Sequence, residues 1–161
     1  MTGTSYLRMI RAANPGPMTL EGTNSWIVGD PGRGPVVVVD PGPMLAEHLD
    51  AIVAAASGGV SAVLLTHRHL DHSEAAPALA LRAGCGVRAA DPQFRVGAAG
   101  LEEGQPLEVA GAYLTVLATP GHTSDSVSAL LQGEDGVVRL LSGDMVLGRG
   151  TTVITLSLIH I

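Results

Sequence analysis

The feature that most constrains this sequence is a group of four metal-binding side chains within six positions, directly after an apolar stretch. The stretch is Ser61–Leu65, and the group is His67, His69, Asp71 and His72. The small and branched residues of the stretch are typical of a covered β-strand, so the group is expected at a sheet edge. Residues two apart on an extended chain point to the same side, so His67 and His69 can reach one cation. Because neutral imidazole and carboxylate suit zinc, the pattern predicts a metal site.

Helices are expected on both sides of this strand. Ser73 is predicted to be the N-cap of a helix that runs to Ala83 and is bent at Pro77. Apolar residues recur at helical spacing over residues 44–57, and this spacing leaves His48 on the solvated face. The remaining strands are expected at 25–29, 36–39, 86–90, 107–109, 113–117, 126–131 and 137–141. The pattern indicates a layered α/β domain.

Three further polar residues follow predicted strands. Asp40 ends strand 36–39, His122 emerges after strand 113–117, and Asp144 follows strand 137–141. Their places at strand ends make them candidates for the same edge of the sheet. For Asp40 a simple turn-forming role is an equal alternative.

Composition excludes several kinds of chemistry. All nine basic residues are arginine, which excludes Schiff-base lysines and the phosphate-loop lysine. Cys85 is the single cysteine, which excludes cysteine-rich zinc sites. A length of 161 residues fits one domain. The formal charge of −6 gives no electrostatic footprint for nucleic acid. No apolar run approaches the roughly 20 residues of a membrane span, so no membrane partner and a cytoplasmic location are expected.

The motif HxHxDH, present as His67, His69, Asp71 and His72, resembles the signature of the metallo-β-lactamase superfamily. Gly121-His122 resembles the next metal-ligand loop of that family, and Gly143-Asp144 resembles the strand end that supplies its bridging aspartate. The segments NPGPMTLEGTNSWIVGD and GRGTTVI resemble the lactamase-like hydrolases that include the β-lactamase-like protein 2 endoribonucleases. The likeness spans Asn14 to Ile154.

This resemblance implies an αββα sandwich with a two-metal centre. His67, His69 and His122 would hold the first cation, Asp71 and His72 would begin the second site, and Asp144 would bridge the two. Asp40 would orient a ligand or the water without binding metal. The implied cofactor is zinc, two per complete protein, with manganese or iron as alternatives.

The expected activity is metal-dependent hydrolysis. A metal-bound hydroxide would attack an ester, thioester, amide or phosphodiester of a small-molecule substrate, and Asp71 would handle the proton. Two alternatives stay open: an endoribonuclease that acts on single-stranded RNA, and a catalytically incomplete metal-binding fragment. Oligomeric state is not predicted.

The sequence departs from the family pattern near its end. The family's final metal-binding histidine is missing after Thr152, so the fold is expected to be incomplete at the C-terminus. Residues 1–154 are predicted to be the N-terminal part of a metallo-β-lactamase-like domain, and residues 155–161 a tail outside the family. His160, in that tail, is a poor substitute for the missing ligand.

Overall fold

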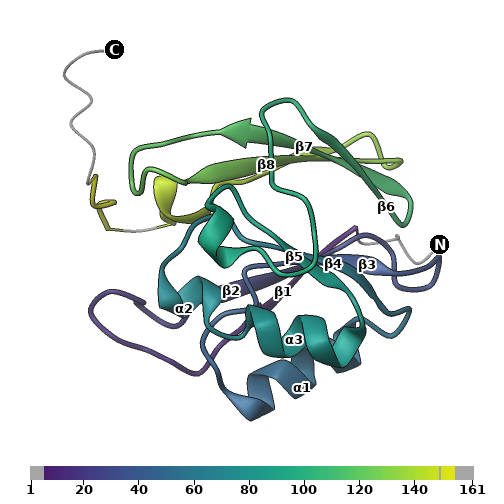
Figure 1. Ribbon diagram of the computed structural model, residues 1–161, viewed down its shortest axis with the longest axis horizontal. Coiled ribbons are helices and arrows are strands. Elements are labelled where there is room, and N and C mark those ends of the chain that lie inside the picture. The colour runs from purple at the N-terminus through teal and green to yellow at the C-terminus, as the bar shows by residue number, and fades with distance from the viewer. Residues whose placement is uncertain (1–5, 149, 155–161) are drawn as a thin grey trace.

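Two β-sheets stacked face to face form the centre of the computed structural model, which describes residues 6–148 and 150–154 (Figure 1). The first sheet is mixed: β1 to β3 run antiparallel, and β3 to β5 run parallel. Its strands in spatial order are β1 (Leu7–Arg11), β2 (Asn24–Val28), β3 (Val36–Val39), β4 (Val60–Leu64) and β5 (Gly86–Arg88). The second sheet is antiparallel, with β6 (Pro106–Val109), β7 (Ala112–Ala118), β8 (Val127–Gly133) and β9 (Val138–Leu141).

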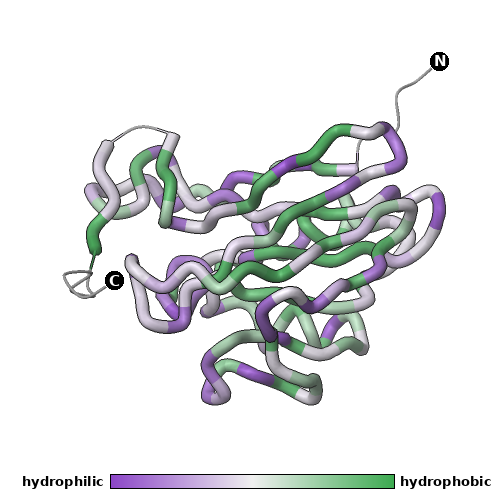
Figure 2. The backbone as a smooth tube through the Cα atoms, turned by 90° about the horizontal axis from the view of Figure 1, so that it is seen from above, coloured by the Kyte–Doolittle hydropathy of each residue, from purple (hydrophilic) through white to green (hydrophobic). Residues whose placement is uncertain are grey.

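Two helices, α1 (Ala46–Ala55) and α3 (Ala76–Ala83), cover the outer face of the first sheet (Figure 1). One apolar core lies between these helices and the sheet, where Ile52 and Leu79 pack with Val38 and Val63. A second core lies between the two sheets. The hydrophobic stretches coincide largely with strands, because each central strand is covered on both faces (Figure 2).

The outer face of the second sheet has no helical cover within the described residues. Tyr113, Val138 and Leu140 lie on this face and are more than half exposed. The described chain therefore forms three layers, helix, sheet and sheet, of the predicted αββα sandwich. No described helix is both long and apolar enough to cross a bilayer.

Two predictions about the helices were wrong. Ser73 is not an N-cap; it ends the short helix α2 (Leu70–Ser73), and its hydroxyl donates to the carbonyl of Arg68. Pro77 lies in the first turn of α3 and does not bend it, because a proline there removes no intrahelical hydrogen bond.

His48 is the third correction, because it is buried instead of solvated. Its side chain lies on the inner face of α1 beside Leu49 and Ile52, and its Nε2 is 2.8 Å from the hydroxyl oxygen of Ser25. The Ser25 hydroxyl supplies a polar partner, so the imidazole can be buried without an unsatisfied nitrogen.

The strand ends that carry the predicted ligands meet at one end of the sandwich. β4 leads through Thr66 into the histidine-rich turn, and the Val127 amide at the start of β8 donates to the carbonyl of Thr66. The short helix η2 (Gly143–Met145) follows β9 at the same end (Figure 1). Both sheets therefore contribute loops to one site.

Candidate metal centre

Three histidines converge where β4 and β7 end. Nδ1 of His69 lies 3.0 Å from Nε2 of His67 and 3.0 Å from Nε2 of His122. His67 and His122 are buried, and His69 is partly exposed. Three imidazole nitrogens facing one point are the donor set that a tetrahedral zinc site uses.

In two of these histidines, the ring nitrogen that faces away from the cluster forms a hydrogen bond with a neighbouring residue. Nδ1 of His122 donates to the carbonyl of Val153 at 2.7 Å, and Nδ1 of His67 lies 3.0 Å from the hydroxyl of Thr66. Because the Thr66 hydroxyl donates its proton to Asp40, it accepts the proton on His67 Nδ1. These bonds leave Nε2 of both rings facing the cluster.

A second group adjoins the three histidines. Nε2 of His72 lies 3.3 Å from Oδ1 of Asp144 and 3.4 Å from Oδ2 of Asp71. The other carboxylate oxygen of Asp144 lies 3.6 Å from Nε2 of His122. Asp144 thus spans the space between the three-histidine group and His72, which is the position that a bridging ligand needs.

Asp40 lies behind both groups and is fully engaged by protein donors. Its Oδ1 accepts the Thr66 amide at 2.7 Å, and its Oδ2 accepts the Thr66 hydroxyl at 2.6 Å and Nδ1 of His72 at 2.9 Å. Asp40 also shares a potential metal-binding group with His67 and His72. Since both of its oxygens already accept hydrogen bonds, we interpret Asp40 as the residue that orients His72 and, through Thr66, His67.

The electrostatics of the site differ between its two halves. Burial, and then the charge of His72, lowers the pKa of His67 to about 4, and burial also lowers the pKa of His69. Both rings are therefore neutral at pH 7, as metal ligands must be. For His72, burial acts to lower the pKa, but the charge of Asp40 and the hydrogen bonds of Asp144 and Asp40 outweigh it and raise the pKa to about 10.

Because its pKa is raised, His72 is protonated at pH 7, and its Nε2 proton lies near the carboxylates of Asp71 and Asp144. Burial acts to raise the pKa of Asp144, yet its hydrogen bond to His72 holds the pKa below the ordinary value. A positive charge at His72 Nε2 is thus favoured by the carboxylates of Asp71 and Asp144. A cation at the same place would displace that proton and meet the same side chains, so Asp71, His72 and Asp144 are the candidates for a second metal ion.

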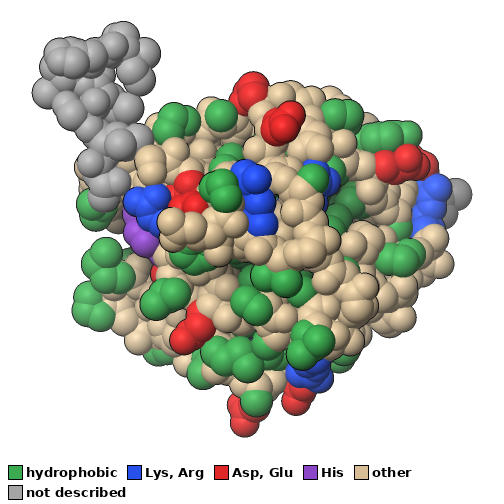
Figure 3. Space-filling model, in the orientation of Figure 1, with side chains coloured by type: hydrophobic (Ala, Val, Ile, Leu, Met, Phe, Trp, Pro, Cys, Tyr) green, Lys and Arg blue, Asp and Glu red, His purple; other side chains and the backbone are tan. Residues whose placement is uncertain are grey.

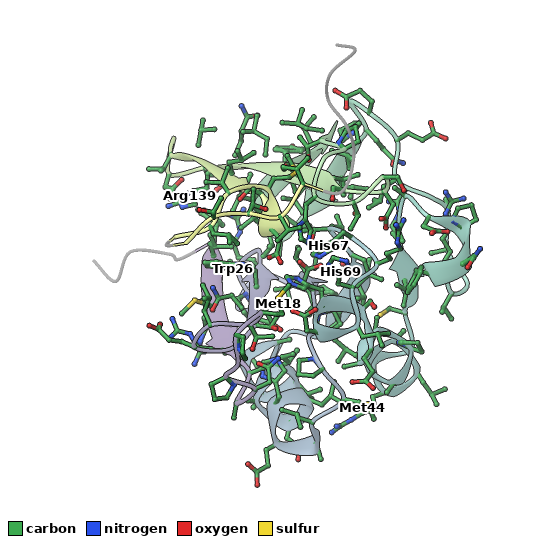
Figure 4. The ribbon with its side chains drawn as sticks, turned by 90° about the vertical axis from the view of Figure 1, so that its left-hand side faces the viewer. Met18, Trp26, Met44, His67, His69 and Arg139 are labelled. Atoms are coloured by element: carbon green, nitrogen blue, oxygen red, sulfur yellow. The ribbon has the colours of Figure 1, made fainter. Side chains whose placement is uncertain are left out.

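A pocket of about 540 Å³ opens beside the second group. Its polar lining includes Thr23, Asp71, His72 and Asp144, so it reaches the candidate ligands. Apolar residues contribute to the remaining wall: Met18, Leu20, Trp26, Val39, Leu141, Val146 and Leu147. Met18 and Trp26 lie on the same side of the molecule as His67 and His69 (Figure 4).

Comparison with known proteins decides the family. The sequence profile of the metallo-beta-lactamase superfamily matches residues 18–158. The chain belongs to this superfamily. A metallo-beta-lactamase family protein from Thermus thermophilus has the same fold, with a TM-score of 0.73 and 24% identity over 94% of this chain and 63% of that one.

Two curated members of the superfamily are similar in sequence. An atrochrysone carboxyl ACP thioesterase from Aspergillus fumigatus is 36% identical over 152 residues, which cover 90% of this chain and 47% of the relative. A beta-lactamase-like protein 2 homolog from Caenorhabditis elegans is 33% identical over 159 residues, which cover 87% of this chain and 50% of the relative. The chain thus spans about half the length of these relatives.

The structure brings together, at this one place, every site residue predicted within the described chain. His160 lies outside the described residues. Sequence reasoning missed two polar residues: Thr66, which relays between Asp40 and His67, and Thr23, whose hydroxyl lies 3.3 Å from Oδ2 of Asp71. Because Thr66 directly precedes His67 in the sequence, its hydroxyl could have been recognised there as a hydrogen-bond partner for the site.

Proposed function

We propose that this chain carries the metal centre of a hydrolase that cleaves thioesters of apolar acyl groups. The observation that carries the proposal is the convergence of His67, His69 and His122, with Asp144 beside them. These residues come from three separate loops, and a shared ligand explains why three buried or half-buried imidazoles lie together.

Within this proposal each candidate ligand has a place. His67, His69 and His122 would hold the first cation, Asp71 and His72 would contribute to the second, and Asp144 would contribute to both. Cations held there would lower the pKa of a coordinated water toward about 7 and stabilise negative charge on the substrate.

The chain's own residues have two further tasks. Asp71 lines the pocket and is partly exposed, so its carboxylate can receive a proton from the attacking water. The wall that contains Met18, Trp26 and Leu141 would bind the acyl group and exclude water from it.

The pocket chemistry favours a thioester over a polyanion. The wall has polar and apolar parts in similar measure, with Met18, Trp26 and Leu141 among the apolar ones, and a relative with 36% identity is named as an acyl carrier protein thioesterase. Arg11 is the basic side chain of the lining, and Glu21 pairs with it at 3.1 Å. Single-stranded RNA is the second candidate because the segments NPGPMTLEGTNSWIVGD and GRGTTVI resemble those of the β-lactamase-like protein 2 endoribonucleases. Against RNA, the face shown in Figure 3 mixes acidic and basic side chains without a broad basic patch.

The test is a substrate panel with matched histidine variants. Zinc-loaded protein is assayed on acyl thioesters of increasing chain length, on oxygen esters and on single-stranded RNA. We expect thioester cleavage that increases with acyl length and disappears with chelator. His69→Ala should abolish both cleavage and zinc binding, whereas His48→Gln, which changes a histidine outside the centre, should retain both.

Other outcomes would select the alternatives. Chelator-sensitive RNA cleavage without thioester cleavage would replace the proposal with the endoribonuclease. Zinc bound near one per chain with no turnover on the panel would favour a catalytically incomplete metal-binding fragment. Full zinc stoichiometry in His69→Ala would overturn the metal centre itself.

A further inference from the structure

Arg68 lies between two candidate ligands in the sequence, but its side chain is directed to a different loop. Its guanidinium Nη1 donates to the hydroxyl of Ser124 at 2.9 Å and to Oδ1 of Asp125 at 3.2 Å. Ser124 and Asp125 belong to the loop that carries His122. The Arg68 side chain therefore connects the turn that holds His67 and His69 to the loop that holds the third histidine.

The two ends of this connection differ in burial. The side chain of Asp125 is 8% exposed, whereas that of Arg68 is 41% exposed. A carboxylate as buried as Asp125 needs a partner, and the guanidinium supplies a charged one. On the Arg68 side the backbone is fixed as well, because its carbonyl accepts the Ser73 hydroxyl at 3.0 Å.

The loop between the two strands is itself closed by short-range hydrogen bonds. The Thr119 amide donates to the carbonyl of Ser126, and the Gly121 amide donates to that of Thr123, both at 3.0 Å. The hydroxyls of Thr123 and Ser126 lie 2.8 Å apart. A loop tied internally in this way moves as one unit, so a bond at Asp125 also restrains His122.

Contacts on the other side of the loop act directly on His122. Its Nδ1 donates to the Val153 carbonyl at 2.7 Å, and its amide lies 3.2 Å from the sulfur of Met145. These contacts orient the ring, and they come from the segment after β9. The contact through Arg68 comes instead from the turn with the other two histidines.

We propose that Arg68 is a positioning residue that sets the distance between the His122 loop and the turn of His67 and His69. The inference rests on the proposed function in that it takes these three histidines as ligands of one cation. Ligand affinity falls in proportion to the fraction of molecules in the binding-competent arrangement. If the loop holds that arrangement one-tenth of the time without Arg68, affinity for the first cation falls about tenfold.

The test measures zinc affinity by competition with a chromogenic chelator, without any need for turnover. Arg68→Met keeps the aliphatic stem but removes both donors, and we expect about tenfold weaker zinc binding. Arg68→Lys keeps a charged donor and should lose less than Arg68→Met. Asp125→Asn removes the charge at the other end and should weaken binding in the same direction.

The double variant Arg68→Met/Asp125→Asn separates this role from a direct effect on the neighbouring histidines. We expect it to bind zinc no more weakly than the weaker single variant, because both changes break one connection. Zinc affinity of Arg68→Met within about twofold of wild type would overturn the inference. A lower melting temperature with unchanged zinc affinity would show that Arg68 stabilises the fold without positioning the zinc ligands.

A third variant distinguishes failure of the inference from failure of the proposed function. His122→Ala should lose zinc affinity more severely than Arg68→Met. If His122→Ala binds zinc as wild type does, the three-histidine site is wrong, and the role of Arg68 falls with it. If His122→Ala loses zinc but Arg68→Met does not, only the role of Arg68 is wrong.

Discussion

His69 and His122 are 53 positions apart in the sequence, yet Nδ1 of His69 lies 3.0 Å from Nε2 of His122. One ring belongs to the turn after β4 in the first sheet, and the other to the loop between β7 and β8 in the second. The contact therefore exists only when the two sheets are stacked in their native arrangement. A ligand that binds both rings should stabilise the whole sandwich.

Zinc is expected to raise the thermal stability of the chain. At a free zinc concentration about 100 times the dissociation constant, the free energy of unfolding should rise by about 2.7 kcal/mol. Thermal unfolding followed by circular dichroism, with zinc and then with excess chelator, measures the change. His122→Ala should show a much smaller shift, and an equal shift in that variant would place the zinc elsewhere.

Replacement of Asp40 by asparagine should destabilise the fold and the site together. Asp40 accepts three hydrogen bonds from Thr66 and His72, and an amide nitrogen in place of an oxygen cannot accept. Asp40 has φ of 51°, a conformation that asparagine tolerates, so backbone strain does not confound the comparison. We expect a loss of about 3 kcal/mol in urea unfolding. Asp30→Asn, at an exposed turn, is the control, and equal losses in the two variants would contradict this account of Asp40.

Gly22, a residue of the pocket wall, has a backbone conformation and surroundings that leave no room for a side chain. Gly22 has φ of 122°, and a Cβ there would lie 2.1 Å from the carbonyl oxygen of Ala12. Gly22→Ala should therefore destabilise the chain by more than about 3 kcal/mol. At Gly84, φ is 67° and a Cβ would meet no atom within 4 Å, so Gly84→Ala should lose only about 1 kcal/mol. Similar losses for both would show that the loop of Gly22 relaxes freely.

His48 should make the stability of the chain depend on pH. Burial lowers its pKa below 6.5, and the backbone hydrogen bond to Pro41 offsets only part of that effect. The unfolded chain then binds the proton more readily than the native one, so native stability is lost as pH falls from 6.5 through the lowered pKa. With chelator present, urea unfolding at several pH values should show a smaller loss in His48→Gln than in wild type. Parallel pH profiles would contradict the assignment.

The sequence predicts those parts of the site that depend on local pattern. His67, His69, Asp71 and His72 follow a strand within six residues, and the bounds expected for that strand lie within one residue of those of β4. His122 and Asp144 are expected at strand ends, but only the resemblance to a family gives them roles. Local periodicity cannot show which strand ends meet, because that depends on how the sheets stack.

The missed features depend on contacts between distant segments. Thr66 relays between Asp40 and His67 because β3 and β4 are parallel neighbours, so the ends of both strands lie side by side. The helical pattern places His48 in solvent because the expected apolar face is defined by Leu45, Leu49, Ile52, Val53 and Ala56. In the structure Leu45 and Val53 are exposed, and the helix buries the face of His48, Leu49, Ile52 and Ala55. Ser25, 23 positions away, makes this burial favourable.

The central claim is that one cation is bound by histidines from both sheets. Anomalous diffraction at the zinc absorption edge, on crystals of the zinc-loaded chain, tests it most directly. The account predicts a peak enclosed by Nε2 of His67, Nδ1 of His69 and Nε2 of His122. A zinc peak that lacks contact with His122, or a zinc-loaded crystal with no peak at this cluster, would contradict it.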